Sequence, residues 1–338
     1  MNAGAGRAGQ PSGDGRLAAM RRTALAVLAP VAAAAVLAGC GGGASSGNAN
    51  DSVKVSGNFN KTPTVTIPAE KASTNLVVSK PIQGTGAPLK SGNSALANVA
   101  VYKWSGSTHK LVDSTFPSGP QMIPAQAGLP GLVTALKGAR LGSRVVAVLP
   151  PKYGYGTSGE SQLGVTSTDT LVWVIDLLQQ YSGKQAAAGP HVSNGGGALP
   201  TVTAQSGQVP TVAIPKTSPP GNLSVTTLIK GSGPTLAKGD TVVAQYVASI
   251  WRTGQEFGST WPSSQQPDGA PFSFQIGGGV LAGFSQGLTG VKVGSRVMLV
   301  IPPSLGYGPL GGNASAGIEK NDTLVFVIDV IGYRPAHG

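Results

Sequence analysis

The residues at 283–287, Gly-Phe-Ser-Gln-Gly, have the types and spacing of a nucleophile elbow, in which the serine attacks a carbonyl carbon. Asp322, Asp329 and His337 follow in the order that a serine hydrolase needs. A nucleophile elbow joins a strand to a helix within an alternating strand–helix fold, and the sequence lacks that alternation. A hydrolase is therefore not favoured.

Two other patterns could bind a nucleotide or a metal. The segments 154–159 and 306–311 both fit G-x-G-x-x-G, which binds dinucleotides where it opens a helix. Pro309 and Ser/Gly-rich stretches follow these glycines, so no helix is expected there. The histidines are too scattered for metal-ligand spacing: His109, His191 and His337. We therefore expect no cofactor and no metal.

The N-terminal segment has the features of an export signal. Arg21 and Arg22 precede an apolar run of sixteen residues, 23–38, which is short for a membrane-spanning helix of about 20 residues. The run ends in Leu-Ala-Gly-Cys, which resembles the bacterial lipobox. We expect residues 1–39 to be a lipoprotein signal peptide and Cys40 to be lipidated, with an uncleaved anchor and an incidental cysteine as the alternative.

Cys40 is the only cysteine, which excludes an intrachain disulfide, a cysteine zinc site and a catalytic cysteine. Acyl chains on Cys40 would attach the protein to the outer face of the cytoplasmic membrane. Residues 40–62 are rich in Gly, Ser and Asn, a composition that predicts a flexible tether.

Composition limits the remaining functions. Charged residues make up 11% of the 338 residues, against about 25% in typical globular chains, and glycine (51) and proline (26) are frequent. This favours β-rich domains with many turns over coiled coils, helical bundles or a wholly disordered chain. The net charge is +11, but the concentrated part of it lies ahead of the apolar run, so no nucleic-acid partner is expected: Arg7, Arg16, Arg21 and Arg22.

An internal repeat organises the rest of the sequence. The hexapeptide P-T-V-T-I-P at 63–68 recurs as P-T-V-A-I-P at 210–215, an offset of 147 residues. At an offset of 152 or 153, G-S-R-V at 142–145 recurs at 294–297, and D-T-L-V-W-V-I-D at 169–176 recurs as D-T-L-V-F-V-I-D at 322–329. The repeat predicts two copies of one domain, at 63–181 and 210–335, with a linker at 182–209.

The hydrophobic pattern within each copy is that of strands. Residues 323–331, 296–301 and 241–250 are rich in β-branched or aromatic residues, and apolar residues alternate along the first of them. The helix candidates are short, one per copy, at 129–137 and 281–289. We therefore predict an α+β fold, in which an antiparallel sheet packs on one helix.

Copy two resembles the FKBP-type peptidyl-prolyl cis-trans isomerases. The motifs that carry the resemblance follow in order: V-V-A-Q-Y at 242–246, P-F-S-F at 271–274, V-L-A-G-F-x-x-G-L at 280–288, V-G-S-R-V-M-L-V-I-P-P at 293–303, L-G-Y-G at 305–308, and T-L-V-F-V-I-D-V at 323–330. The resemblance implies two FKBP-like domains, each a curled antiparallel sheet wrapped around one short helix, with an apolar pocket between sheet and helix.

Such a pocket suits the reaction that the resemblance implies. Rotation about an Xaa–Pro amide bond breaks no bond but crosses a barrier of roughly 20 kcal/mol. The twisted amide has lost resonance and charge separation, so an apolar, aromatic surround that grips the proline ring favours it over the ground state.

The resemblance implies nine pocket residues in copy two, with Phe284 at the floor, where the family commonly has tryptophan. The Leu281 N–H and the Tyr307 hydroxyl would donate to substrate carbonyls. Gly258 departs from the family's pattern, because the family has an aspartate there. The nine residues are Tyr246, Phe257, Phe272, Val280, Leu281, Phe284, Tyr307, Ile318 and Phe326.

Copy one departs further from the family. Without a gap, Val99 falls at the position of Tyr246, whereas a three-residue gap would place Tyr102 there. Val112, Leu132 and Trp173 replace Phe257, Phe284 and Phe326, whereas Tyr155 is kept and Asp113 retains the family's aspartate that copy two lacks. We expect copy one to be a degenerate scaffold or binding domain.

The resemblance and the export signal together predict an isomerase that assists the folding of exported, proline-containing polypeptides at the membrane surface, with its activity in copy two. Macrolides are further candidate ligands. The alternative is a non-catalytic chaperone or peptide-binding lipoprotein on the same scaffold.

Overall fold

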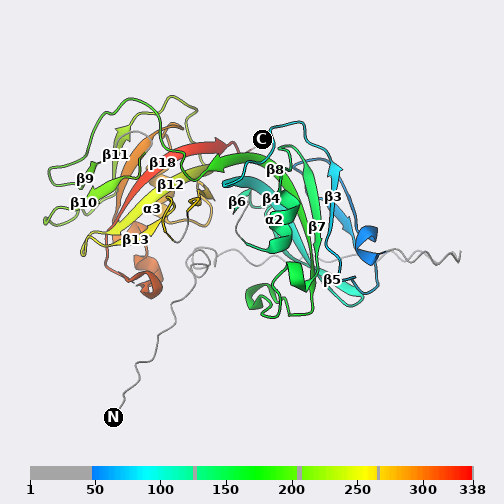
Figure 1. The fold of residues 1–338 in the computed structure, drawn as a ribbon. Coiled ribbons are helices and arrows are strands. Elements are labelled where there is room, and N and C mark those ends of the chain that lie inside the picture. The colour runs from blue at the N-terminus through cyan, green and yellow to red at the C-terminus, as the bar shows by residue number, and fades with distance from the viewer. Residues whose placement is uncertain (1–47, 125–127, 204–207, 265–266, 337–338) are drawn as a thin grey trace, which may run out of the picture.

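The computed structural model describes residues 48–124, 128–203, 208–264 and 267–336. Within them lie two six-stranded antiparallel sheets, one in each copy of the repeat, and each sheet carries one short α-helix (Figure 1). The predicted α+β class with two FKBP-like domains is confirmed. We call the two copies domain 1 and domain 2.

In domain 1 the strand order is β3-β7-β8-β4-β5, and β6 also pairs with β4. Helix α2 lies across one face of this sheet (Figure 1). The elements are β3 (Val77–Ile82), β4 (Asn93–Ser105), β5 (Thr108–Ser114), β6 (Gln121–Pro124), α2 (Pro130–Leu136), β7 (Arg144–Leu149), the 3₁₀ turns η2 (Pro151–Tyr153) and η3 (Ser161–Leu163), and β8 (Thr170–Ser182).

Domain 2 repeats this arrangement in the order β11-β15-β18-β12-β13, with β14 paired to β12. Its elements are β11 (Ser224–Ile229), β12 (Thr241–Ile250), β13 (Glu256–Ser259), β14 (Phe272–Gln275), α3 (Ala282–Leu288), β15 (Arg296–Ile301), η4 (Pro303–Leu305), η5 (Gly308–Leu310), β16 (Gly312–Asn313), η6 (Ala314–Ala316), β17 (Ile318–Glu319) and β18 (Leu324–Arg334).

Helix α3 approaches the sheet closely because two of its residues lack a Cβ. A Cβ on Gly283 would lie 2.5 Å from the Ile301 side chain, and one on Gly287 would lie 2.7 Å from that of Leu299. Real Cβ atoms essentially never come so near another atom. Only glycine at these two positions of α3 therefore allows the helix to pack this closely on the aliphatic side chains of β15. This contact sets the distance between the helix and the sheet that holds the predicted site.

The structure departs from the flexible-tether prediction over residues 48–62. Residues Ala49–Ser52 form the 3₁₀ turn η1, and β1 (Lys54–Ser56) pairs with β2 (Thr64–Thr66). The Arg144 guanidinium, itself paired with Asp176 at 2.7 Å, donates to the carbonyls of four residues of this segment: Ser56, Gly57, Asn58 and Lys61. The segment covers the outer face of the domain 1 sheet, where the valines of β7 and β8 would otherwise meet water.

The predicted linker, 182–209, also packs against a sheet where the structure describes it. The Asp329 carboxylate, paired with Arg296, accepts a hydrogen bond from the Ala187 N–H at 2.8 Å. Farther along, β9 (Thr201–Thr203) pairs with β10 (Thr211–Ala213), and Val202 is buried against the outer face of the domain 2 sheet. The sequence predicted only a linker here, but its described part packs because it covers the apolar outer face of the domain 2 sheet.

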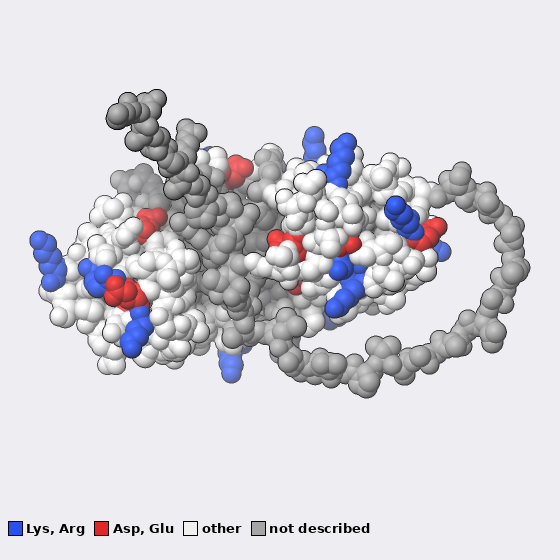
Figure 2. Space-filling model, turned by 90° about the horizontal axis from the view of Figure 1, so that it is seen from below, with Lys and Arg blue, Asp and Glu red and all other residues white. Residues whose placement is uncertain are grey.

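On the face shown in Figure 2, Lys and Arg side chains are scattered over both domains with Asp and Glu side chains among them. Within the described part of the chain, no helix is long and apolar enough to cross a membrane.

Candidate active site

All nine residues predicted for the site of domain 2 lie in one apolar cluster between the sheet and α3. The cluster has a buried floor and a partly exposed rim. The floor consists of Phe284, Tyr307, Ile318 and Phe326, and the rim consists of Tyr246, Phe257, Phe272, Val280 and Leu281.

Phe326 of β18 is the centre of the cluster. Its ring centroid lies 4.7 Å from that of Phe284, 5.7 Å from that of Phe257 and 5.9 Å from that of Tyr246, each in an edge-to-face arrangement. Tyr246 in turn meets Phe272 edge-on at 6.1 Å. Edge-to-face pairs hold one another in place, so the rim rings are fixed by the floor.

Phe274 belongs to the same cluster and was missed by the sequence reasoning. It stacks on Phe272 at 5.3 Å and meets Phe284 edge-on at 5.5 Å. The signal was present, because residues two apart on a strand share a face, and the P-F-S-F motif places both phenylalanines on the same face of β14.

The Tyr307 hydroxyl is positioned by Asn313. Asn313 Oδ1 accepts a hydrogen bond from Ser315 at 2.7 Å, which leaves the Asn313 amide group to donate to Tyr307. Burial raises the pKa of Tyr307, and the hydrogen bond with Asn313 opposes that shift. Tyr307 is therefore a neutral phenol whose own proton can be donated to a carbonyl.

The second predicted donor, the Leu281 N–H, has no acceptor among the residues that the structure describes. Leu281 is the N-cap of α3, and its carbonyl accepts from the N–H of Phe284 at 2.9 Å. The first N–H groups of a helix have no partner within the helix, so this one can donate to a substrate.

Tyr246 and Gly258 face each other across β12 and β13. Burial, with a smaller contribution from Tyr307, raises the pKa of Tyr246 to about 12, so Tyr246 is neutral at physiological pH. A Cβ on Gly258 would lie 3.7 Å from the Tyr246 hydroxyl, an ordinary contact distance. The place of the family's aspartate is thus beside this hydroxyl.

The residues that could have formed a hydrolase site are not brought together. Ser285 Oγ accepts a hydrogen bond from the Gly277 N–H at 2.9 Å on the helix side of the sheet. Asp329 lies on the opposite, linker-covered face in its pair with Arg296, and Asp322 pairs with Arg252. His337 lies outside the described residues.

The second copy is similar to proteins of one known family. The family model of FKBP-type peptidyl-prolyl cis-trans isomerases matches residues 233–331. The FK506-binding protein of Streptomyces anulatus is 38% identical over 123 residues, which cover 36% of this chain and 94% of that protein. The chain belongs to the FKBP family. The probable FK506-binding protein of Corynebacterium glutamicum is 37% identical over 36% of this chain and 96% of its own length.

Among solved structures, FkpA from Escherichia coli is 34% identical, with 34% of this chain and 49% of that chain covered and a TM-score of 0.29.

Strand register decides which residue of domain 1 corresponds to Tyr246. Tyr246 pairs with Ile328, and its repeat counterpart Val99 pairs with Ile175, the counterpart of Ile328. Tyr102 packs on the outer face of the sheet with the valines of β7 and β8. The ungapped alignment is therefore correct, and the gapped alternative is wrong.

The inner cluster of domain 1 is largely aliphatic. Leu132 is buried in it, and Val112 and Trp173 pack against it. Asp113 pairs with Val101 as Gly258 pairs with Ala248, which places this carboxylate at the position that domain 2 leaves empty. Six ring–ring contacts join the aromatic side chains of the domain 2 cluster. The aromatic chemistry of an FKBP site is thus concentrated in the second copy.

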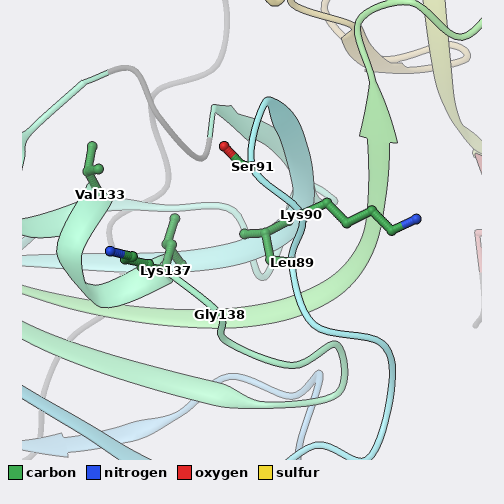
Figure 3. A pocket seen from close by; sticks show the side chains of 7 residues that line it. Leu89, Lys90, Ser91, Val133, Lys137 and Gly138 are labelled. Carbon is green, nitrogen blue, oxygen red and sulfur yellow. The ribbon is translucent and has the colours of Figure 1, made fainter.

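A hollow of about 350 Å³ lies beside α2 of domain 1, and its lining includes Leu89 and Leu136 of the domain 1 inner cluster (Figure 3). The Lys90 side chain extends away from Val133 and Lys137 of this lining. Its full lining is Leu89, Lys90, Ser91, Val133, Leu136, Lys137 and Gly138.

Proposed function

We propose that domain 2 catalyses cis-trans isomerisation of Xaa–Pro bonds, with the nine cluster residues as its substrate site. The observation that carries this proposal is the aromatic cluster, whose partly exposed rim stands beside two available donors, the Leu281 N–H and the Tyr307 hydroxyl. A proline ring seated against Tyr246, Phe257 and Phe272 would lose water. The donors would hold the flanking carbonyls while the amide twists.

The reaction needs no nucleophile, because the amide only rotates. An apolar surround stabilises the twisted amide relative to the planar one, since the planar amide carries the larger charge separation. The uncatalysed step takes tens of seconds, which is slow compared with most folding steps. A surface that binds the twisted form more tightly therefore accelerates proline-limited folding.

The test is an isomerisation assay of the full chain on an Xaa–Pro peptide, with Tyr307→Phe and its matched control Tyr155→Phe in domain 1. Loss of one hydrogen bond, worth about 1 kcal/mol, should lower kcat/KM about fivefold in Tyr307→Phe. Tyr155→Phe should leave kcat/KM unchanged. A loss in Tyr155→Phe alone would assign the activity to domain 1.

A wild-type chain that does not accelerate isomerisation, yet binds proline peptides, would instead support the non-catalytic chaperone. Domain 1 gives that alternative some structural support, because it keeps the fold but has aliphatic residues at three of the positions where domain 2 has rings: Val99, Val112 and Leu132.

We further propose that the protein is an exported lipoprotein attached to the outer face of the cytoplasmic membrane through Cys40, where its clients are exported, proline-containing polypeptides. The packing of residues 48–62 shortens the predicted spacer. Residues 41–47 could span at most about 25 Å if fully extended, so the first FKBP domain would stand close to the lipid surface. Incorporation of radioactive palmitate that Cys40→Ser abolishes tests the anchor, and incorporation that persists in Cys40→Ser would refute it.

A further inference from the structure

We infer that domain 1 acts as a support for the substrate site of domain 2, and that Ser273, Gly183 and Gly332 are positioning residues at the contact between the two domains. This inference rests on the proposed isomerase activity of domain 2. It assigns domain 1 a role that does not require a pocket of its own.

The two domains meet through equivalent parts of the repeat. Leu96 of β4 and its counterpart Val243 of β12 are both fully buried in one small cluster with Tyr181 and Ile331. β6 and its counterpart β14 also meet, where the Met122 N–H donates to Ser273 Oγ at 3.0 Å. Like surfaces that meet in this way form an isologous contact, as in a twofold symmetric dimer.

Two glycines make the contact close. A Cβ on Gly332 of β18 would lie 2.3 Å from the Tyr181 hydroxyl, and a Cβ on Gly183 would lie 1.9 Å from the Asp268 carbonyl oxygen. Neither glycine has a positive φ, so alanine would be strained at these positions only by the opposing domain. Burial raises the pKa of Tyr181 to about 12, which agrees with a dry contact.

The contact reaches the segments that carry the rim of the substrate site. Phe272 and Phe274 point into the aromatic cluster, and Ser273 between them points to domain 1. The segment 260–271 connects β13, which carries Phe257, to β14.

This connecting segment is also where domain 2 differs from domain 1. It has twelve residues, whereas the equivalent segment 115–120 has six, and the additional length brings Asp268 and Gly269 against Gly183. At its start, Thr260 Oγ1 accepts from the Tyr246 N–H at 2.8 Å. Domain 1 and the linker therefore contact a segment that is joined to the rim at both ends. The segment follows β13, which carries Phe257, and its first residue accepts from the Tyr246 N–H; it leads into Phe272, the first residue of β14.

The first experiment uses the full chain and measures hydrogen–deuterium exchange of residues 256–275 in Gly332→Ala and Gly183→Ala. Gly221→Ala is the matched control, because a Cβ there would meet nothing within 4 Å. We expect faster exchange of β13 and β14 in the two contact variants and no change in the control. Unchanged exchange of both strands in both contact variants would overturn the inference.

The second experiment measures kcat and KM of the full chain for an Xaa–Pro peptide in Ser273→Ala and Ser273→Thr. Loss of the acceptor should loosen the rim and raise KM roughly threefold to tenfold, the range expected for coupling between residues in contact. A purely structural loss of folded protein would lower kcat and leave KM unchanged. Threonine keeps the oxygen, so Ser273→Thr should restore KM.

A KM in Ser273→Ala equal to the wild-type value would refute the positioning role. If the wild-type chain proves inactive, the proposed isomerase function fails. The exchange experiment still decides whether domain 1 holds the rim.

Discussion

Restoring the missing aspartate at position 258 tests the chemistry of the site most directly. Gly258 lies on β13 opposite Ala248, and its backbone is outside the left-handed region that favours glycine. A Cβ there would lie 3.7 Å from both the Cε2 and the hydroxyl of Tyr246, an ordinary contact distance. Gly258→Asp therefore introduces a carboxylate within reach of the Tyr246 hydroxyl and should cause no steric strain.

The expected gain follows from two opposing contributions. A hydrogen bond from the Tyr246 hydroxyl to a charged carboxylate is worth about 1.5–3 kcal/mol. The carboxylate loses part of its hydration at this half-buried position, which offsets a substantial part of that gain. A net stabilisation of about 1 kcal/mol in the bound state would raise kcat/KM about fivefold, because it fixes the Tyr246 ring as part of the rim.

The assay compares kcat/KM of Gly258→Asp with that of Gly258→Ala, which adds the same Cβ without the carboxylate. A second pair of variants in a Tyr246→Phe background removes the hydroxyl and should abolish the gain. The reasoning is refuted if Gly258→Asp is no better than Gly258→Ala, or if the gain persists without the Tyr246 hydroxyl.

Phe284→Ala removes a ring 4.7 Å from that of Phe326 and should lower the free energy of unfolding by about 3–5 kcal/mol in a denaturant titration, whereas a loss below about 1 kcal/mol would contradict a packed floor. Because burial raises the pKa of Tyr246 and of Tyr181 to about 12, the folded state favours the neutral phenols. The stability that they contribute is complete below pH 10 and is lost as the pH rises toward 12; an alkaline unfolding series should show this loss, reduced in each Tyr→Phe variant. Arg144→Met leaves the Asp176 carboxylate buried without its partner and should cost about 3–5 kcal/mol, with faster protease cleavage within 48–62. A further Asp176→Leu substitution should recover part of that loss, and no recovery would show that the ion pair is not the cause.

The sequence predicted the fold well because the repeat shows the hydrophobic pattern of each helix and strand twice. Helices were expected at 129–137 and 281–289, and the structure has Pro130–Leu136 and Ala282–Leu288, with the residues on either side as caps. The strand predicted at 296–301 has these bounds in the structure. Alternating apolar residues also place Phe326 and Ile328 on the inner face, where they contribute to the aromatic cluster.

Composition gave a wrong prediction where a polar segment is ordered by the apolar surface that it covers. Residues 48–62 are mostly polar, but they cover valines on the outer face of β7 and β8. A usable signal lay in the covered strands. Arg144–Leu149 reads R-V-V-A-V-L and is buried at every position, and such continuous apolar runs are typical of strands with both faces covered.

Sequence reasoning could not give the contact between the domains, because that contact depends on the absence of side chains. In the sequence, Gly183 and Gly332 cannot be told from ordinary turn and strand glycines. Their role follows from the groups that lie against them in the structure, the Asp268 backbone and the Tyr181 side chain. The extra length of 260–271 was visible as a change in the repeat offset, but its partner surface was not.

The two domains share the polar contacts of their buried side chains and differ at the proposed substrate site. Trp104 and Trp251 each donate an indole N–H to a backbone carbonyl at 2.9 Å, and Arg144 and Arg296 each pair with a buried aspartate. These groups would be costly to leave unpaired, so either copy needs them in order to fold. At the proposed substrate site, domain 2 has Tyr246, Phe257 and Phe284 where the inner cluster of domain 1 has valine or leucine. We infer that domain 1, which keeps the costly buried contacts, has fewer rings and packs against the rim of its neighbour, is the structural partner of the domain that we propose to be catalytic.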